Sequence, residues 1–134
     1  MRLAAALLGV LLATPAWADD CPLDLGRGAG WVVFSDRYLM AFRSDPLRIE
    51  VGEPFALLVN VCTRRNGAAE LLAVDANMPE HRHGMNYRAT IVAKGNGRFR
   101  AEGLLFHMPG RWEITFDVRA GSESERLTHD IILK

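Results

Sequence analysis

The sequence has little of three things: charge of one sign, long apolar runs and cysteine. Its 134 residues include 16 basic and 16 acidic side chains, so the formal net charge is zero. A balanced chain without a basic stripe lacks the electrostatic footprint of a nucleic-acid-binding protein. Beyond residue 13, no apolar run reaches the roughly 20 residues that span a bilayer. We therefore expect no nucleic-acid partner and no stable membrane anchor, and look for partners among small ligands and envelope proteins.

The first 18 residues have the pattern of a secretory signal peptide. One basic residue, Arg2, precedes an apolar run over residues 3–13, and the small-x-small triplet Ala16-Trp17-Ala18 follows. An uncleaved anchor is the alternative, but the apolar run is too short for one. We expect cleavage after Ala18 and export to the periplasm. The mature chain, residues 19–134, is long enough for one compact domain with its own core.

Cys21 and Cys62 are the only cysteines. In an oxidising compartment, two cysteines most simply form one disulfide. Such a bond would close a loop of about 40 residues and stabilise the fold by roughly 4 kcal/mol in the chain-entropy model. The alternative is that Cys62 is a thiolate metal ligand. The residues after Cys62, Thr-Arg-Arg-Asn-Gly, lack the His and Met that a blue-copper centre would place there.

Catalytic patterns are also missing. No serine or cysteine nucleophile is paired with a histidine in a recognisable motif, and no pair of carboxylates indicates acid–base chemistry. The expected mature N-terminus is Asp19 and not a histidine, which excludes a histidine brace built on the terminal amine. We therefore predict that the protein is not an enzyme.

Segments with strand character make up most of the mature chain. Residues 112–118 alternate between apolar and polar side chains, a period of two that is typical of a half-buried strand. No segment shows a sustained helical period, and turn-forming residues separate the segments. The pattern predicts an all-β fold, an immunoglobulin-like antiparallel β-sandwich of about seven strands. The expected strands lie within residues 37–44, 55–61, 70–77, 87–93, 98–106, 112–118 and 127–134.

Histidine and methionine, by contrast, are concentrated locally. Three of the four histidines, and three of the four methionines that follow Met1, fall within residues 77–87 and 107–108. The exceptions are His129 and Met40. Imidazole accepts copper, zinc, nickel or iron, whereas thioether sulfur is a soft ligand that selects Cu(I). The candidate metal ligands are Met78, His81, His83, Met85, His107 and Met108.

The strand order predicts that these two segments meet. Residues 87–93 should run to the opposite end of the domain, where Asn96-Gly97 favours a tight hairpin. Residues 98–106 should then run back to the second segment, where Pro109-Gly110 forces the next turn. Neighbouring strands lie only about 5 Å apart. The histidines and methionines of both segments should therefore share one end of the sandwich.

The expected ligand geometry follows from side-chain alternation. In an extended first segment, His81, His83 and Met85 would project to one side, whereas Met78 has the opposite parity. His107 or Met108 could complete the set. A mixed His/Met site with few carboxylates in an exported protein favours copper over zinc, with Cu(I) preferred and zinc as the alternative.

Several features favour structural roles instead. Glu80 is the only carboxylate in the cluster, and Arg82, Arg88 and Arg111 oppose a dication unless they point away. The two histidines of the first segment could be structural, and Met85 and Met78 could serve packing alone. His107 could satisfy backbone groups and Met108 could fill the turn.

Two aromatic residues outside the ligand set also have alternative interpretations. His129 is in step with Ile131 and Leu133 on the last expected strand, which indicates a core or edge histidine. Trp112 could cap the site through a cation–π contact, but its alternation with Ile114 indicates a core position first.

Two motifs resemble the YtkA-like family of small exported domains, over residues 49–133. The resemblance implies an immunoglobulin-like β-sandwich and a role in copper handling or in assembly of a respiratory oxidase. The matching positions are Met78, Pro79, His81, His83 and Gly84 in the first motif, and Phe106, Met108, Pro109, Gly110 and Trp112 in the second.

The sequence thus supports two hypotheses of different classes. The first is a periplasmic copper-binding protein, a Cu(I) carrier or buffer that exchanges its ion with another envelope protein. The second is a non-metal interaction module that assists assembly of a membrane or respiratory complex. It would use an apolar patch of Leu104 and Phe106, if these point outward and Leu105 points inward.

Overall fold

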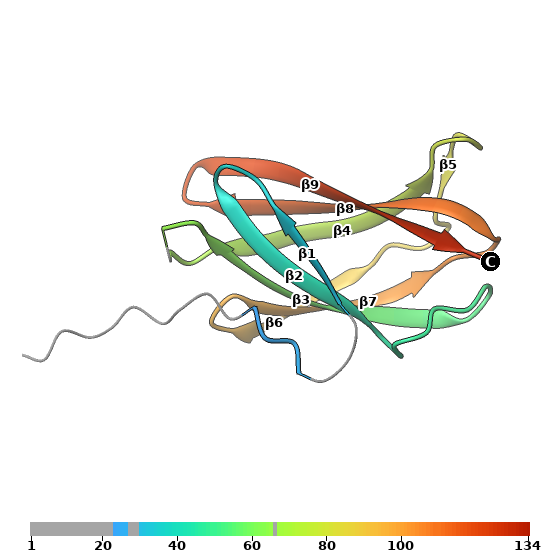
Figure 1. The fold of residues 1–134 in the computed structure, drawn as a ribbon, viewed down its shortest axis with the longest axis horizontal. Helices are drawn as coiled ribbons and strands as arrows, with labels where there is room; N and C mark the ends of the chain where they lie inside the picture. Colours follow the sequence, from blue (N-terminus) through green and yellow to red (C-terminus); the bar gives the residue numbers. More distant parts are fainter. Residues whose placement is uncertain (1–22, 27–29, 66) are drawn as a thin grey trace, which may run out of the picture.

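A computed structural model of the protein describes residues 23–26, 30–65 and 67–134. Within them, nine strands form two antiparallel sheets that pack as a sandwich (Figure 1). This confirms the all-β antiparallel sandwich predicted from the sequence. The first sheet has the order β1-β2-β3-β7-β6, with β1 Trp31–Phe34, β2 Tyr38–Asp45, β3 Pro54–Thr63, β7 Arg98–Leu105 and β6 Thr90–Gly95. The second has the order β5-β4-β8-β9, with β5 His83–Gly84, β4 Glu70–Met78, β8 Gly110–Ala120 and β9 Glu123–Leu133.

The predicted signal peptide, residues 1–18, and Cys21 lie outside the described residues. No helix in the described part of the chain is long and apolar enough to cross a membrane.

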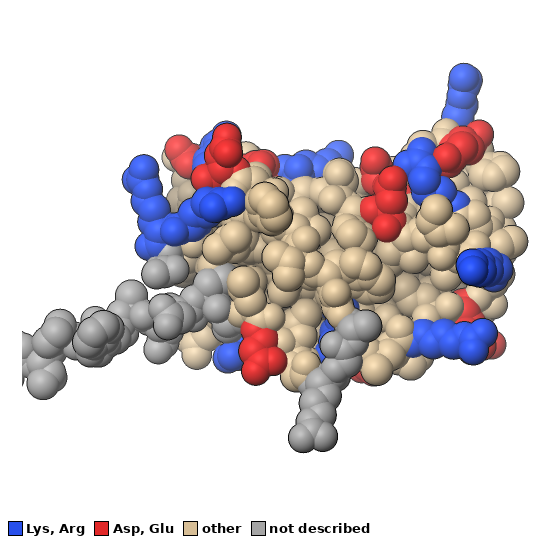
Figure 2. Space-filling model, in the orientation of Figure 1, with Lys and Arg blue, Asp and Glu red and all other residues tan. Residues whose placement is uncertain are grey.

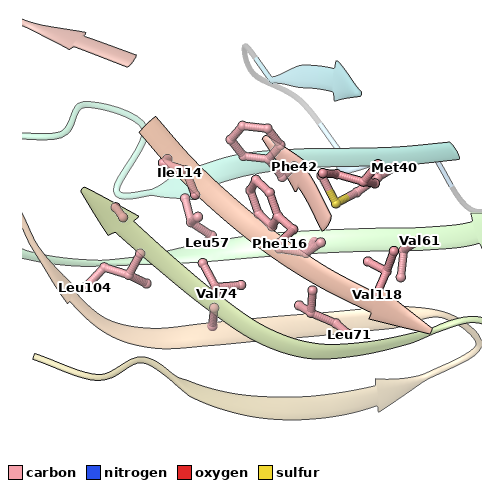
Figure 3. Packing of buried hydrophobic residues seen from close by; sticks show 14 of the residues in the cluster. Met40, Phe42, Leu57, Val61, Leu71, Val74, Leu104, Ile114, Phe116 and Val118 are labelled. Atoms are coloured by element: carbon pink, nitrogen blue, oxygen red, sulfur yellow. The ribbon is translucent and has the colours of Figure 1, made fainter. Parts of the chain in front are cut away.

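The core lies between the two sheets (Figure 3). Trp112, Ile114, Phe116 and Val118 of β8 are all completely buried, as their period of two predicted. Phe116 meets Phe42 of β2, with ring centroids 4.8 Å apart. Burying each such side chain contributes about 1.5–3 kcal/mol, so β8 is a main support of the sandwich.

The chain enters and leaves the candidate segments as expected. β6 and β7 pair antiparallel, and the hairpin between them has Asn96 and Gly97 at φ of 53° and 72°. That positive φ is the conformation that Asn-Gly adopts most easily. β7 therefore returns the chain to the end of the sandwich from which β6 came.

The prediction of an outward apolar patch at Leu104 and Phe106 is wrong. Leu104 and Phe106 are both 0% exposed and belong to the core, and Leu105 is only half-buried. Phe106 packs against Phe55, with ring centroids 4.9 Å apart. Leu104 and Phe106 are buried in the core between the two sheets, so these two residues form no outward patch for a partner.

Candidate metal centre

The first His/Met segment is a tight hairpin between β4 and β5. Met78 pairs with His83 in the register of the two strands, and the His81 amide donates a hydrogen bond to the Met78 carbonyl at 3.0 Å. Arg82, at φ of 55°, turns the chain into β5. The backbone therefore turns at His81. This differs from the extended segment that the prediction from side-chain alternation required. Only His83 and Met85 keep the spacing of a strand.

Met78 is part of the core and not of the rim. Directly paired residues of an antiparallel ladder place their side chains on the same face, so Met78 and His83 share a face despite their opposite parity. Met78 is 0% exposed. A Cβ added to Gly110 would lie 2.7 Å from Met78 Cε. The Met78 side chain thus packs beneath the second segment, which favours a packing role for it.

The second segment is held in place from below by Trp112. The indole stacks on Phe106, with centroids 4.5 Å apart and planes at 9°. Its Nε1 donates a hydrogen bond to the Met108 carbonyl at 3.0 Å. Trp112 is 0% exposed, so it is a core residue first, as its alternation indicated. In the sequence, His107 lies between the buried Phe106 and Trp112. Its own side chain is exposed, at the rim of the sandwich.

The two segments meet at one end of the sandwich. In Figure 1 the β4–β5 tip and the β7–β8 connection both lie at the right-hand end. The His83 ring lies between the other two imidazoles, with its centroid 5.1 Å from that of His107 and 5.7 Å from that of His81. Trp112 lies 5.4 Å from His107 and 6.2 Å from His83. The convergence predicted from strand order is confirmed.

These separations can be compared with those of rings that share an ion. A metal–nitrogen bond of about 2.0–2.1 Å places an imidazole centroid about 3.2 Å from the metal, so two ligand rings lie about 5.2 Å apart at the tetrahedral angle and at most about 6.4 Å apart. The two separations, 5.1 and 5.7 Å, are close to the lower part of this range. His83 is therefore near enough to His107, and near enough to His81, for each pair of rings to share an ion.

The imidazoles of His81, His83 and His107 do not have the arrangement of metal ligands in this structure. Among the residues that the structure describes, no three His, Cys, Asp or Glu side chains form a group that could hold a metal ion as it stands. His81 and His107 are exposed, so their rings can turn without repacking the core. His83 Nδ1 lies 3.4 Å from the Gly84 carbonyl oxygen. A carbonyl oxygen only accepts, so a hydrogen bond at this contact requires the proton on Nδ1 and leaves Nε2 as the ligand atom.

Two methionines supply sulfur at the same end. Met85 and Met108 are half-buried and pack against the edge of the core. Met85 follows His83 by two residues, and its amide donates a hydrogen bond to the Ala76 carbonyl at 3.1 Å, which continues the pairing with β4. Met108 directly follows His107. Both thioethers therefore belong to segments that carry an imidazole of the cluster.

Arg111, one of the arginines near the imidazoles, is paired with two carboxylates. Arg111 Nε donates to Glu80 Oε1 at 2.7 Å, and Arg111 Nη1 donates to Asp130 Oδ2 at 2.9 Å. The hydrogen bond from Arg111 lowers the pKa of Glu80 below its ordinary value. Arg111 therefore does not oppose a cation with an unpaired charge. Arg82 and Arg88 are exposed. In Figure 2 both signs of charge occur at this end of the visible face, and neither dominates.

His129 and Cys62 lie outside the cluster. The His129 ring packs against Trp31 and Phe42, with centroids 5.6 and 5.3 Å apart, and its burial lowers its pKa. It is the core or edge histidine that the alternation of the last strand indicated. Cys62 is disulfide-bonded and is therefore not a thiolate ligand. Its pairing with Cys21 stays a prediction, because Cys21 lies outside the described residues.

Arg111 and Glu80 differ from what their positions in the sequence predict. From the sequence alone, Arg111 opposes a metal and Glu80 is a lone carboxylate. Their 31-residue separation gives no local signal of an ion pair. Only the meeting of the two segments brings them together.

Comparison with known proteins found no family model, no curated protein and no solved structure that matches this chain. The resemblance to the YtkA-like family therefore stays a prediction, and the function is argued from the residues themselves.

Proposed function

We propose that this protein is an exported copper-binding protein, a carrier or buffer that holds Cu(I) between the β4–β5 hairpin and the β7–β8 connection. The observation that carries the proposal is the position of the His83 ring, 5.1 Å from His107 and 5.7 Å from His81. One imidazole thus links donors from two segments that are distant in sequence. The predicted signal peptide supports a periplasmic location, and the YtkA-like resemblance supports a role in copper handling.

The donor set supports Cu(I) as the preferred ion. Three imidazoles alone would also suit Zn(II), but Met85 and Met108 add soft thioethers, which favour Cu(I). Glu80, next to His81 in the chain, hydrogen-bonds Arg111, and this contact competes with its use as a hard ligand. Because His81 and His107 are exposed, an incoming ligand from a partner could replace them one at a time. That property suits delivery to, or uptake from, another envelope protein.

Competitive titration tests the proposal. The mature protein should take Cu(I) from a chromophoric chelator under ascorbate, with one ion bound per chain. His83→Ala should weaken binding most, because it removes the central ring, and by more than the roughly 10–100-fold that loss of an outer-shell partner costs. His81→Ala and His107→Ala should have smaller effects. His129→Phe is the matched control and should bind as wild type does. Absence of competition by the wild type, or an unchanged His83→Ala, would refute the proposal.

The choice between copper and zinc rests on the thioethers. Leucine is close to methionine in volume, so Met85→Leu/Met108→Leu should leave the fold intact. The double variant should lose Cu(I) affinity while its Zn(II) affinity stays unchanged, because Zn(II) prefers nitrogen, thiolate and oxygen ligands. Parallel titrations with the two ions measure this difference. Tighter binding of Zn(II) than of Cu(I) by the wild type would replace copper with zinc in the proposal.

A further inference from the structure

Arg111 connects the two segments that carry the imidazoles. It is the second residue of β8, and the β7–β8 connection with His107 and Met108 ends just before it. Its Nε hydrogen-bonds Glu80, at the tip of the β4–β5 hairpin and next to His81. Its Nη1 hydrogen-bonds Asp130 on β9. One guanidinium therefore ties the first segment, the second segment and the neighbouring strand together.

The anchor of this arrangement is rigid. β8 and β9 pair without a register shift from Gly110–Leu133 to Ala120–Glu123, so Arg111 and Asp130 are fixed relative to each other. The planar guanidinium has donors in fixed directions. With Nη1 held by Asp130 at 2.9 Å, Nε points to Glu80 at 2.7 Å. Asp130 thus orients the donor that binds the hairpin tip.

The hairpin tip needs such a tie. β5 consists of two residues at the edge of its sheet, and it pairs only with Asn77 and Met78 of β4. His81 and Arg82 at the tip are exposed. Few backbone hydrogen bonds and little buried surface are typical of segments that open locally at low cost. The side-chain contact of Glu80 with Arg111 spans from this tip to the rigid sheet.

We infer that Arg111 is a positioning residue of the metal centre, which keeps the β4–β5 tip, with His81 and His83, close to His107. The inference rests on the proposed function. Arg111 itself would not be a ligand, because a guanidinium has no lone pair to donate to a metal. It acts through Glu80, and its positive charge weakens the attraction of the Glu80 and Asp130 carboxylates for a hard cation.

The size of the expected effects separates this role from a purely structural one. The side chains of Arg111, Glu80 and Asp130 are 33%, 55% and 47% exposed. Ion pairs this exposed typically contribute little to folding, because water screens them. A positioning role therefore predicts a lower Cu(I) affinity with little change in stability, whereas a purely structural role leaves the affinity unchanged.

The experiment compares Arg111→Gln and Glu80→Gln with Arg126→Gln. Arg126 makes the same kind of contact on the same sheet, with Asp117 at 2.6 and 2.9 Å, but has no part in the hairpin. Arg111→Gln and Glu80→Gln should each lower Cu(I) affinity by roughly 2–5-fold, because the tip spends less time close to His107. The double variant should be no worse than Arg111→Gln, because both changes remove one interaction. Arg126→Gln should leave the affinity unchanged and lower the melting temperature as much as Arg111→Gln does.

A second measurement follows the tip without metal. Backbone amide order parameters of residues 80–83 should fall in Arg111→Gln and stay unchanged in Arg126→Gln. If the wild type binds Cu(I) while Arg111→Gln shows the same affinity and the same order parameters, the inference is wrong and the proposed function stands. If the wild type binds no Cu(I), the proposed function fails, and the metal role of Arg111 fails with it.

Discussion

His83 and His129 are both half-buried imidazoles, and their surroundings give them different chemistry. His83 lies at the rim between two other imidazoles. His129 lies on the long hairpin of β8 and β9, opposite Ile114, with its ring against Trp31 and Phe42. Burial among apolar rings disfavours the charged form of an imidazole, so the pKa of His129 is lowered, and the nearby Asp130 offsets only part of this.

The lowered pKa of His129 predicts a loss of stability in mild acid. As the pH falls below the ordinary pKa of about 6.5, the unfolded chain takes up a proton at this site before the folded protein does. The free energy of unfolding should therefore decrease with falling pH until the folded pKa is passed. His129→Phe keeps a ring in place and removes the titration. Urea unfolding of both proteins between pH 8 and 5 measures the difference.

The three rim histidines are the same in both proteins, so their titration cancels in that comparison. The wild type should lose stability relative to His129→Phe as the pH falls through this window. A stability difference between the two proteins that stays constant with pH would show that burial of His129 does not penalise its charged form.

At the scale of elements, the turn that carries Met108 depends on Gly110. Its φ is 126°, a conformation that other residues rarely adopt, and a Cβ there would lie 2.7 Å from Met78 Cε. Gly110→Ala should therefore lower the free energy of unfolding by about 2 kcal/mol or more, from backbone strain and overpacking together. It should also weaken Cu(I) binding. The added methyl group would displace the Met78 side chain, and a displaced Met78 would move the two segments apart. Chemical unfolding and copper titration measure the two effects.

Gly121 is the matched control for that substitution. It has φ of 60° in the β8–β9 hairpin, and an added Cβ would meet nothing within 4 Å. Gly121→Ala should cost about 1–2 kcal/mol of backbone strain and leave copper binding unchanged. Equal losses of copper binding in the two variants would mean that the contact of Gly110 with Met78 does not position the site.

The elements differ in how far the sequence could predict them. All seven expected strands exist, because each contains residues that favour strands and is bounded by turn residues. β1 was missed because its four residues, Trp-Val-Val-Phe, are all apolar and show no period, although Val32 and Phe34 are exposed. β5 was missed because two residues are too few to show a pattern.

The candidate site was predictable in its location and less so in its details. One hairpin, marked by Asn96-Gly97, sufficed to place both segments at the same end. Side-chain direction required more than alternation, since the turn at Arg82 changes the register and puts Met78 on the same face as His83. The contact of Arg111 with Glu80 depends on three-dimensional packing alone.

At the scale of the whole molecule, the disulfide and the rim cluster lie at opposite ends of β3. Phe55, near the start of the strand, contacts Phe106, and Phe106 stacks on Trp112 below the imidazoles. Cys62 is seven residues further along β3, which at about 3.3 Å per residue is roughly 23 Å away. The sandwich therefore separates the bond that stabilises the chain from the residues that we propose bind the ion.

This separation predicts that stability and copper binding can be changed independently. Replacing both cysteines, Cys21→Ser/Cys62→Ser, should lower the free energy of unfolding by about 2–5 kcal/mol, because the unfolded chain regains the freedom that the cross-link removes. At a temperature where this variant is still folded, its Cu(I) affinity and stoichiometry should equal those of the wild type. Both cysteines must be changed, since a single replacement would leave a thiol that itself binds Cu(I). Loss of the ion from the folded double variant would place a sulfur of the disulfide in the site, and would contradict a centre built only from the His and Met side chains of the rim.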